Sequence, residues 1–441
     1  MQNINYAIRK TNKTNEKNRK RRYSPALSEA ITAVAWVVYA AAYFGRINYT
    51  VVMPALSARF GWDKAALGMI AGGFFWAYAI GQLVNGVLGD KFNPRIYVAI
   101  GLGVSGIMNI AASFVVSFWT MQVIWTLNGF FQSMLWGPII RTVSFRVKPE
   151  SRGGATTALY TSTIAGYMGA FLSLGYVARN DWRLAFWIPG VLLLAMALLW
   201  VLTVRIQPED ASISSEVEVT PVLTEAKSRL GGSFLSFILK NSLLPLAFVC
   251  TLHGVIKESV GSWGPYLLSE THSMDYSDAL RLISVVPIVN FLAILLYSWY
   301  NKVKGRDFNK NLIFFYAASC VFALVLFIWL HAHPAFALIL LALISVTQMA
   351  VNAVFTTLLP LSYAKDGRVS SVAGFMDFTV YLGAAISSPA IGFIAEAGGW
   401  RRIALLWSGI CACALLTLYL TVIKVRKSHR SMKVALKNML D

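Results

Sequence analysis

Residues 33–54 read AVAWVVYAAAYFGRINYTVVMP, an apolar run of membrane length in which the cation Arg46 stands eight residues before the closing proline. Residues 242–268 read SLLPLAFVCTLHGVIKESVGSWGPYLL, and Lys257 again stands eight residues before a proline. A charge at the centre of a bilayer costs at least about 2.5 kcal/mol, so such residues normally face a cavity and mark a substrate path. Matching cations in both halves therefore predict a path for an anion, provided that the chain spans a membrane.

Composition indicates that it does. Hydrophobic residues make up 57% and charged residues 13% of the 441 positions, about half the charge of a typical soluble protein. Apolar runs of about 20 residues, the length that crosses a bilayer, are found near 33–54, 65–88, 95–115, 119–143, 154–177, 184–204, 242–268, 279–300, 311–331, 335–359, 370–395 and 402–423. These runs lack the strict alternation of a transmembrane barrel, and only a helical bundle then satisfies every backbone group. We therefore expect an all-α integral membrane protein with twelve transmembrane helices.

The net charge of +19 is also typical of proteins that bind nucleic acid, so the positions of the lysines and arginines decide between the two readings. The two tails and every second loop hold 29 of the 39 cations, the opposite loops hold seven, and Arg46, Arg141 and Lys257 lie within spans. The positive-inside rule then places both termini in the cytoplasm. Because this orientation accounts for the excess of cations, we expect a multi-pass protein of the cell (plasma or inner) membrane with no nucleic acid partner. The basic tail, residues 9–22, follows from this orientation, although contact with anionic lipid headgroups is an alternative. It lacks the apolar core and cleavage site of a signal peptide.

The distribution of polar segments divides the chain into five parts. Residues 1–28 and 425–441 are expected to be basic cytoplasmic tails, and residues 29–204 and 241–424 to be six-helix bundles. The connector, residues 205–240, is rich in serine and acidic residues and is expected to be a flexible cytoplasmic linker that ends in a short surface helix.

The two halves resemble each other, as in transporters built from repeats. Besides the two cations, residues 166–170 (GYMGA) match residues 380–384 (VYLGA), and Trp182-Arg183 matches Trp400-Arg401 at the start of the last helix of each half. The matches follow the same order along the chain. We therefore expect two pseudo-symmetric six-helix bundles.

The cysteines give no sign of chemistry. Cys250, Cys320, Cys411 and Cys413 all lie in apolar spans, where a thiol usually behaves as a small buried hydrophobe. The sequence contains no cluster of metal ligands, no nucleophile motif and no cofactor motif. We expect no metal, no cofactor and no enzymatic activity.

The loop that follows the second expected span, residues 86–95, reads GVLGDKFNPR. Glycines let helix ends approach closely, and Asp90 can pair with a basic partner on the cytoplasmic face. Such a pair would act as a latch that holds one conformation, with Lys91, Arg95 and Arg141 as the nearby cations. The alternative is a plain polar turn that carries positive-inside charges, and for Arg141 it is a packing role.

This loop is similar to the signature loop of the major facilitator superfamily, and almost the whole chain resembles one branch of it, the organophosphate:phosphate antiporters. That branch includes the bacterial glycerol-3-phosphate and hexose-phosphate transporters. The resemblance is carried by Arg46-Ile47-Asn48-Tyr49, Met53-Pro54, Asp90-Lys91, Asn93-Pro94-Arg95, Asn128-Gly129, Gln132, Trp136-Gly137-Pro138, Arg141, residues 150–154, Asn180-Asp181-Trp182, Trp263 and Pro265-Tyr266-Leu267. It implies the major facilitator fold and alternating access, with two bundles rocking about a central site.

The resemblance also implies which residues bind the substrate. Arg46 matches the arginine that binds the substrate phosphate, and the tyrosines expected around it are Tyr39, Tyr43 and Tyr78. Tyr381 matches the substrate-binding tyrosine of the eleventh helix. The family's second arginine falls on Lys257, which keeps the charge but loses the planar fork that grips phosphate oxygens.

Two further positions depart from the glycerol-phosphate carriers. Gln82 replaces a lysine and Thr163 replaces a histidine, which leaves a weaker positive field in the cavity. Gln132 is a candidate cavity residue, although polar side chains also join transmembrane helices by hydrogen bonds. His253, one turn before Lys257, is a further candidate for the cavity.

Glu258 places a carboxylate beside Lys257. Neighbouring residues point about 100° apart on a helix, so Glu258 is free to reach another helix, pair with a cation or take up a proton. One hypothesis is that Glu258, with Asp377, couples anion movement to protons; the alternative is that Glu258 only neutralises Lys257.

The sequence therefore predicts a transporter of a small organic anion, with an organophosphate exchanged for inorganic phosphate around Arg46 and Lys257. A proton-coupled carboxylate symporter and a sugar-phosphate sensor on the same fold are the alternatives. We expect the chain to work as a monomer in the lipid bilayer.

Overall fold

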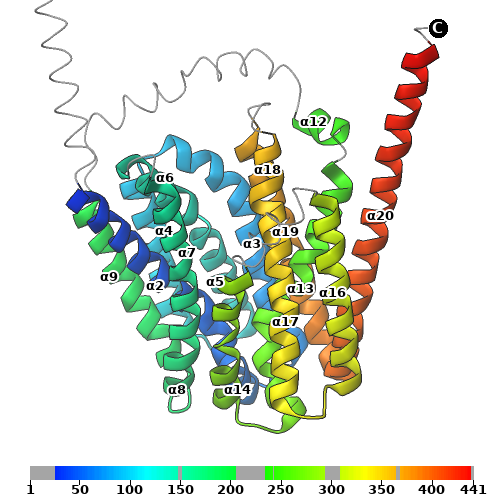
Figure 1. Cartoon of the computed structure of the whole chain (residues 1–441). Coiled ribbons are helices and arrows are strands. Elements are labelled where there is room, and N and C mark those ends of the chain that lie inside the picture. The colour runs from blue at the N-terminus through cyan, green and yellow to red at the C-terminus, as the bar shows by residue number, and fades with distance from the viewer. Residues whose placement is uncertain are drawn as a thin grey trace, which may run out of the picture.

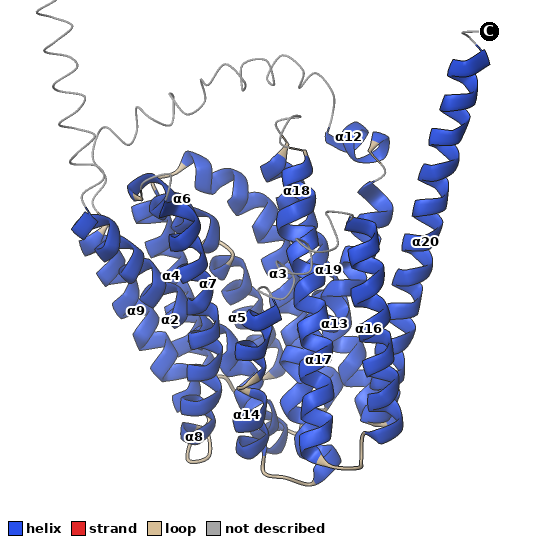
Figure 2. Cartoon of the chain, in the orientation of Figure 1, coloured by secondary structure: helices blue, strands red, loops and turns tan. Residues whose placement is uncertain are grey.

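The structure is a computed structural model that describes residues 25–147, 151–204, 234–241, 243–293, 308–363 and 368–438. Within these ranges the chain is helical and contains no strand (Figure 2). Ten helices of the described part are long and apolar enough to cross a membrane. The two remaining expected crossings are present as interrupted helices, so the prediction of an all-α membrane fold is confirmed.

The first half of the chain forms a bundle on the left of Figure 1. Its elements are α2 (Pro25–Phe60), α3 (Lys64–Lys91), α4 (Pro94–Ala112), α5 (Phe118–Gln132), α6 (Trp136–Arg146), α7 (Arg152–Gly169), a π-helical segment (Ala170–Leu174), α8 (Gly175–Val177) and α9 (Leu184–Thr203). The fourth expected span is thus broken between α5 and α6, and the fifth widens into the π-helical segment before α8.

The second half forms a bundle on the right. Its elements are α12 (Phe234–Lys240), α13 (Leu243–His272), α14 (Tyr276–Ile283), α16 (Phe308–Trp329), α17 (Pro334–Ala353), a second π-helical segment (Val354–Leu358), α18 (Leu359–Ser362), α19 (Val369–Gly398) and α20 (Trp400–Asn438). The apolar helical run that begins with α14 continues to Ala293. We name the two ends of the molecule after the helices that mark them in Figure 1, the α12 end at the top and the α8 end at the bottom.

Several expectations fall outside the described residues. These are most of the first tail and of the linker, the end of the eighth expected span, and the side chains of residues 422–441. The side chains of Asp90 and Lys91 also lie outside the described part.

Glycines allow the close crossings inside each bundle. A Cβ atom at Gly129 of α5 would collide with the carbonyl oxygen of Phe74 of α3, and one at Gly383 of α19 would collide with the carbonyl oxygen of Thr251 of α13. Helices in lipid associate through such close backbone contacts, because lipid tails are as apolar as the helix surfaces.

The two bundles meet most closely where α3 crosses α19. A Cβ atom at Gly68 of α3 would collide with the carbonyl oxygen of Ser388, and one at Gly392 of α19 would collide with the carbonyl oxygen of Lys64. These positions lie in the first half of α3 and the second half of α19, which is the α8 end. Backbone contact therefore closes the interface between the bundles at that end.

Candidate functional site

A cavity of about 390 Å³ lies between the two bundles. All six residues that the sequence predicts to bind substrate line it: Arg46, Lys257, Tyr39, Tyr43, Tyr78 and Tyr381. Gln82, Thr163, Glu258 and Asp377 line it as well. The fold thus brings residues from helices α2, α3, α7, α13 and α19 to one chamber.

Aromatic rings surround the guanidinium group of Arg46. Its Cζ atom lies 4.6 Å from the ring centroid of Tyr78, 5.4 Å from that of Tyr381, 5.5 Å from that of Phe74 and 5.7 Å from that of Tyr43. Distances below about 6 Å permit cation–π attraction, which partly replaces the hydration of the charge. Among the described residues, the guanidinium group of Arg46 forms no hydrogen bond and no ion pair. Its N–H donors are therefore available to an anion in the cavity.

A buried polar network fixes the backbone next to Arg46. The side-chain amides of Asn109, Asn128 and Gln132 donate hydrogen bonds of 3.2, 3.0 and 3.0 Å to the carbonyl oxygen of Gly45. These amides come from α4 and α5, so three bonds from neighbouring helices hold α2 one residue before its cation. Gln132, an expected cavity residue, is buried in this network and is not part of the cavity lining.

Tyr381 of α19 links the two predicted cations. Its ring centroid lies 5.4 Å from Cζ of Arg46 and 5.9 Å from Nζ of Lys257. The ring also packs against Tyr78 of the other bundle, with 4.4 Å between centroids. Arg46 and Lys257 therefore approach the same ring from opposite bundles.

Lys257 and Glu258 form an ion pair. Nζ of Lys257 lies 2.6 Å from Oε1 of Glu258, with the two side chains 23% and 8% exposed. The long lysine side chain bridges the 100° that separates adjacent helix positions, so the alternative in which Glu258 neutralises Lys257 describes the observed contact. Arg46 is thus the less compensated of the two cations.

His253 lies behind the cavity wall. Its Nδ1 is 2.8 Å from the side-chain oxygen of Gln348, and its Nε2 is 3.2 Å from that of Asn352. Asn352 lines the cavity, whereas His253 is fully buried and does not. Of the two hydrogen-bond partners of this ring in the described part of the chain, Asn352 is the one that lines the chamber.

Two residues of the predicted latch make hydrogen bonds within the first bundle. Arg141 of α6 donates from Nη1 to the carbonyl oxygen of Gly89 at 2.9 Å, and Arg95 of α4 donates from Nε to that of Val201 at 2.8 Å. Arg141 thus contacts the residue that precedes Asp90. The two bonds tie α6 to the end of α3 and α4 to α9.

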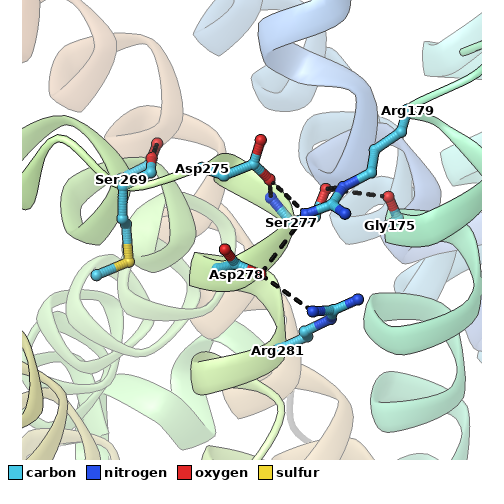
Figure 3. A network of polar contacts seen from close by, with 8 residues as sticks. Gly175, Arg179, Ser269, Asp275, Ser277, Asp278 and Arg281 are labelled. Carbon is cyan, nitrogen blue, oxygen red and sulfur yellow. Dashed lines mark hydrogen bonds and ion pairs between the residues drawn. The ribbon is translucent and has the colours of Figure 1, made fainter.

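A polar network joins the bundles at the α8 end (Figure 3). Arg179, just after α8, donates to Oγ of Ser277 at 2.6 Å and to Oδ1 of Asp275 at 2.8 Å. Asp278 lies 3.6 Å from the same guanidinium group and 3.1 Å from that of Arg281. The hydrogen bond from Arg179 lowers the pKa of Asp275 below its ordinary value.

A proline explains a second contact between the bundles. Pro54 of α2 has no N–H group, so the carbonyl oxygen of Thr50 lacks its usual helical donor. The hydroxyl of Tyr276, at the start of α14, donates to that oxygen at 2.6 Å.

Lys64, at the start of α3, supplies a third contact. Its Nζ lies 3.1 Å from Glu270 of α13 and 3.4 Å from Glu396 of α19. We refer to the contacts of Arg179, Tyr276 and Lys64 across the interface as the α8-end seal. Sequence reasoning missed all three residues, and Pro54, which removes the donor to Thr50, hinted only at the contact of Tyr276.

Comparison with known proteins agrees with this architecture. The Major Facilitator Superfamily profile matches residues 35–386. A "Probable hexose phosphate transport protein" of Chlamydia trachomatis is 28% identical, with 89% of each chain covered. A "Glycerol-3-phosphate transporter" of Bacillus subtilis is 25% identical, with 88% of this chain and 90% of that protein covered.

Other similar proteins differ in their described roles. A "Membrane sensor protein UhpC" of Salmonella typhimurium is 24% identical, with 91% of this chain and 93% of that protein covered. The crystal structure of a bacterial homologue of the human lysosomal transporter Spinster superposes with a TM-score of 0.71 at 14% identity, over 89% of this chain and 96% of that one. This likeness concerns the fold alone. From the profile match and the shared fold together, the chain belongs to the Major Facilitator Superfamily.

Proposed function

We propose that this protein is a secondary transporter that exchanges an organophosphate for inorganic phosphate. The observation that carries the proposal is the environment of Arg46, a cation on a cavity wall that contacts aromatic faces and keeps its N–H donors available. A guanidinium group matches the geometry of phosphate oxygens and binds them through two parallel hydrogen bonds. The names of the relatives, which include hexose phosphate and glycerol-3-phosphate transporters, support the same class of substrate.

Transport would proceed by alternating access. The α8-end seal closes one side, and the cavity extends from Arg46 toward Tyr160, Thr356 and Ala373, which lie nearer the α12 end. The positive-inside rule assigns the α12 end to the cytoplasm, so this conformation would load substrate from the cytoplasm.

The placement of the cations supplies a reason for exchange. Arg46 lies on one bundle and Lys257, which is paired with Glu258, lies on the other, and closure of the empty cavity would enclose the uncompensated charge of Arg46. A phosphate bound beside Arg46 offsets that cost and permits closure. An empty carrier would then reorient slowly and a loaded one quickly, which couples the movement of one anion to the return of another.

Phosphate-loaded proteoliposomes test the proposal. We expect uptake of radiolabelled phosphate in exchange for internal phosphate, inhibition by organophosphates, and loss of exchange in Arg46→Ala. Arg183→Lys is the matched control, because Arg183 lies at the α8 end and rests on Trp182 outside the cavity. Exchange by Arg46→Ala at the wild-type rate would refute the assignment of the site.

A second candidate function is proton-coupled transport of an organic anion, since Glu258 and Asp377 both line the cavity. An imposed pH gradient separates the two mechanisms, because exchange of phosphate for phosphate needs none. Glu258→Gln that kept the wild-type response to a pH gradient would exclude Glu258 from coupling. A sensor, as in the relative of that name, would bind the organophosphate without sustained turnover.

A further inference from the structure

The charged residues of the cavity balance one another. Four charged side chains line the described cavity: Arg46, Lys257, Glu258 and Asp377. At neutral pH two cations face two carboxylates, and the formal sum is zero. A site for a simple phosphate dianion gains from excess positive charge, whereas this chamber offers positive and negative charge in separate places.

The negative charge that remains open to a ligand belongs to Asp377. Lys257 pairs with Glu258 at 2.6 Å. Asp377 interacts with Lys257 only at longer range, and within the described part of the chain it forms no ion pair or hydrogen bond. Its position is one helical turn before Tyr381 on α19, so the two residues share a face, about 6 Å apart along the helix axis.

Aromatic residues of the first bundle line the same cavity as this carboxylate. Tyr160 of α7 lines the cavity, is 42% exposed and interacts electrostatically with Asp377. Its ring centroid lies 5.2 Å from that of Trp136, which in turn lies 4.7 Å from that of Tyr39. A carboxylate that shares a cavity with a row of aromatic rings is a combination that binds ammonium groups, through charge attraction and cation–π contact.

We infer that the organophosphate carried by this protein also bears an ammonium group. The phosphate occupies the donors of Arg46, and the ammonium group lies one helical turn toward the α12 end, between Asp377 and the rings of Tyr160 and Trp136. The inference rests on the proposed function for the position of the phosphate and adds the class of substrate, a zwitterionic amino-organophosphate.

Two matched pairs of probes test this inference by binding to the purified protein. Ethanolamine phosphate is compared with glycerol 3-phosphate, and glucosamine 6-phosphate with glucose 6-phosphate, by calorimetric titration at pH 7. We expect the amino compound of each pair to bind at least about tenfold more tightly, the discrimination that follows when a buried charged group finds or loses its partner. Equal affinities within the pairs would overturn the inference.

Variants assign the discrimination to Asp377. In Asp377→Asn the cavity gains a formal positive charge, so the preference for the amino compounds should fall to about twofold or less and the hydroxyl compounds should bind more tightly. Asp377→Glu should retain a preference, and Glu29→Gln, which alters an exposed carboxylate of α2, should keep the wild-type ratio. A preference that survives in Asp377→Asn would overturn the assignment.

Transport separates this inference from the proposed function. If the protein exchanges phosphate but binds both probes of each pair equally, the proposed function stands and the inference of a zwitterionic substrate is refuted. Discrimination in binding without phosphate exchange refutes the exchanger and supports the ammonium site. If Asp377 instead carries a coupling proton, the paired probes bind equally and Asp377→Asn loses its response to a pH gradient, which also overturns the inference.

Discussion

Replacing Tyr276 with phenylalanine tests the α8-end seal. The change removes one hydroxyl, which donates to the carbonyl oxygen of Thr50 at 2.6 Å. That oxygen has no helical donor, because Pro54 lies four residues later. In the closed state the variant leaves a partly buried carbonyl without a partner, whereas in the open state water can reach it. A net hydrogen bond contributes about 1 kcal/mol, so we expect the ratio of open to closed molecules at this end to rise roughly fivefold.

Spin labels on the two bundles measure that ratio. Cysteines at Tyr176 and His331, both exposed at the α8 end, give one label on each bundle once Cys413, the exposed native cysteine, is changed to serine. Double electron–electron resonance should show a larger long-distance fraction in Tyr276→Phe. Tyr419→Phe, which removes an exposed hydroxyl from α20, is the control.

A double-mutant cycle makes the test specific. Pro54→Ala restores an N–H donor for the oxygen of Thr50 and should therefore make Tyr276→Phe nearly neutral. An unchanged distance distribution in Tyr276→Phe, an equal shift in Tyr419→Phe, or additive effects of the two substitutions would refute the reasoning.

Three further predictions concern packing, positioning and pH. Gly383→Ala should lower the Tm in detergent, because overpacking costs about 1–3 kcal/mol. Gly374→Ala, where a Cβ atom meets open space, should keep the wild-type Tm. A wild-type Tm in Gly383→Ala would contradict the close α13–α19 crossing. Gln132→Leu removes amide bonds that hold the backbone before Arg46 and should raise the KM for phosphate about threefold in exchange assays, whereas an unchanged KM would remove it from that role. Because Arg179 lowers the pKa of Asp275, closure of the α8 end should persist from pH 8 to about 5 and weaken only as the pH falls through that lowered value. In Arg179→Gln this difference in the pKa of Asp275 is mostly lost, so closure should depend less on pH in the acid range, and an unchanged profile by electron–electron resonance would disprove the link.

The sequence predicts the fold and the position of the central cation because both depend on local patterns. Membrane-length apolar runs define the spans, and charge that is too costly for lipid places Arg46 and Lys257 on a cavity wall. Tyr39, Tyr43, Tyr78 and Tyr381 follow from the family resemblance, and all four line the observed cavity. Phe74, which also packs against Arg46, was not among the predicted residues.

The remaining features depend on contacts that one sequence does not specify. The geometry of adjacent helix positions left the partner of Glu258 open, and the structure shows that the lysine side chain is long enough to pair Lys257 with Glu258. The bond between Arg179 and Asp275 joins residues 96 positions apart in separate bundles, and no pattern along the chain relates them. The break between α5 and α6 likewise falls inside a continuous apolar run.

Direct binding of phosphate to the purified protein tests the central claim, that Arg46 is the anion site. Calorimetric titration of inorganic phosphate should show saturable binding to the wild-type protein and to Arg183→Lys, and none to Arg46→Ala at the same concentrations. Wild-type affinity in Arg46→Ala would contradict the account, since the phosphate would then bind elsewhere.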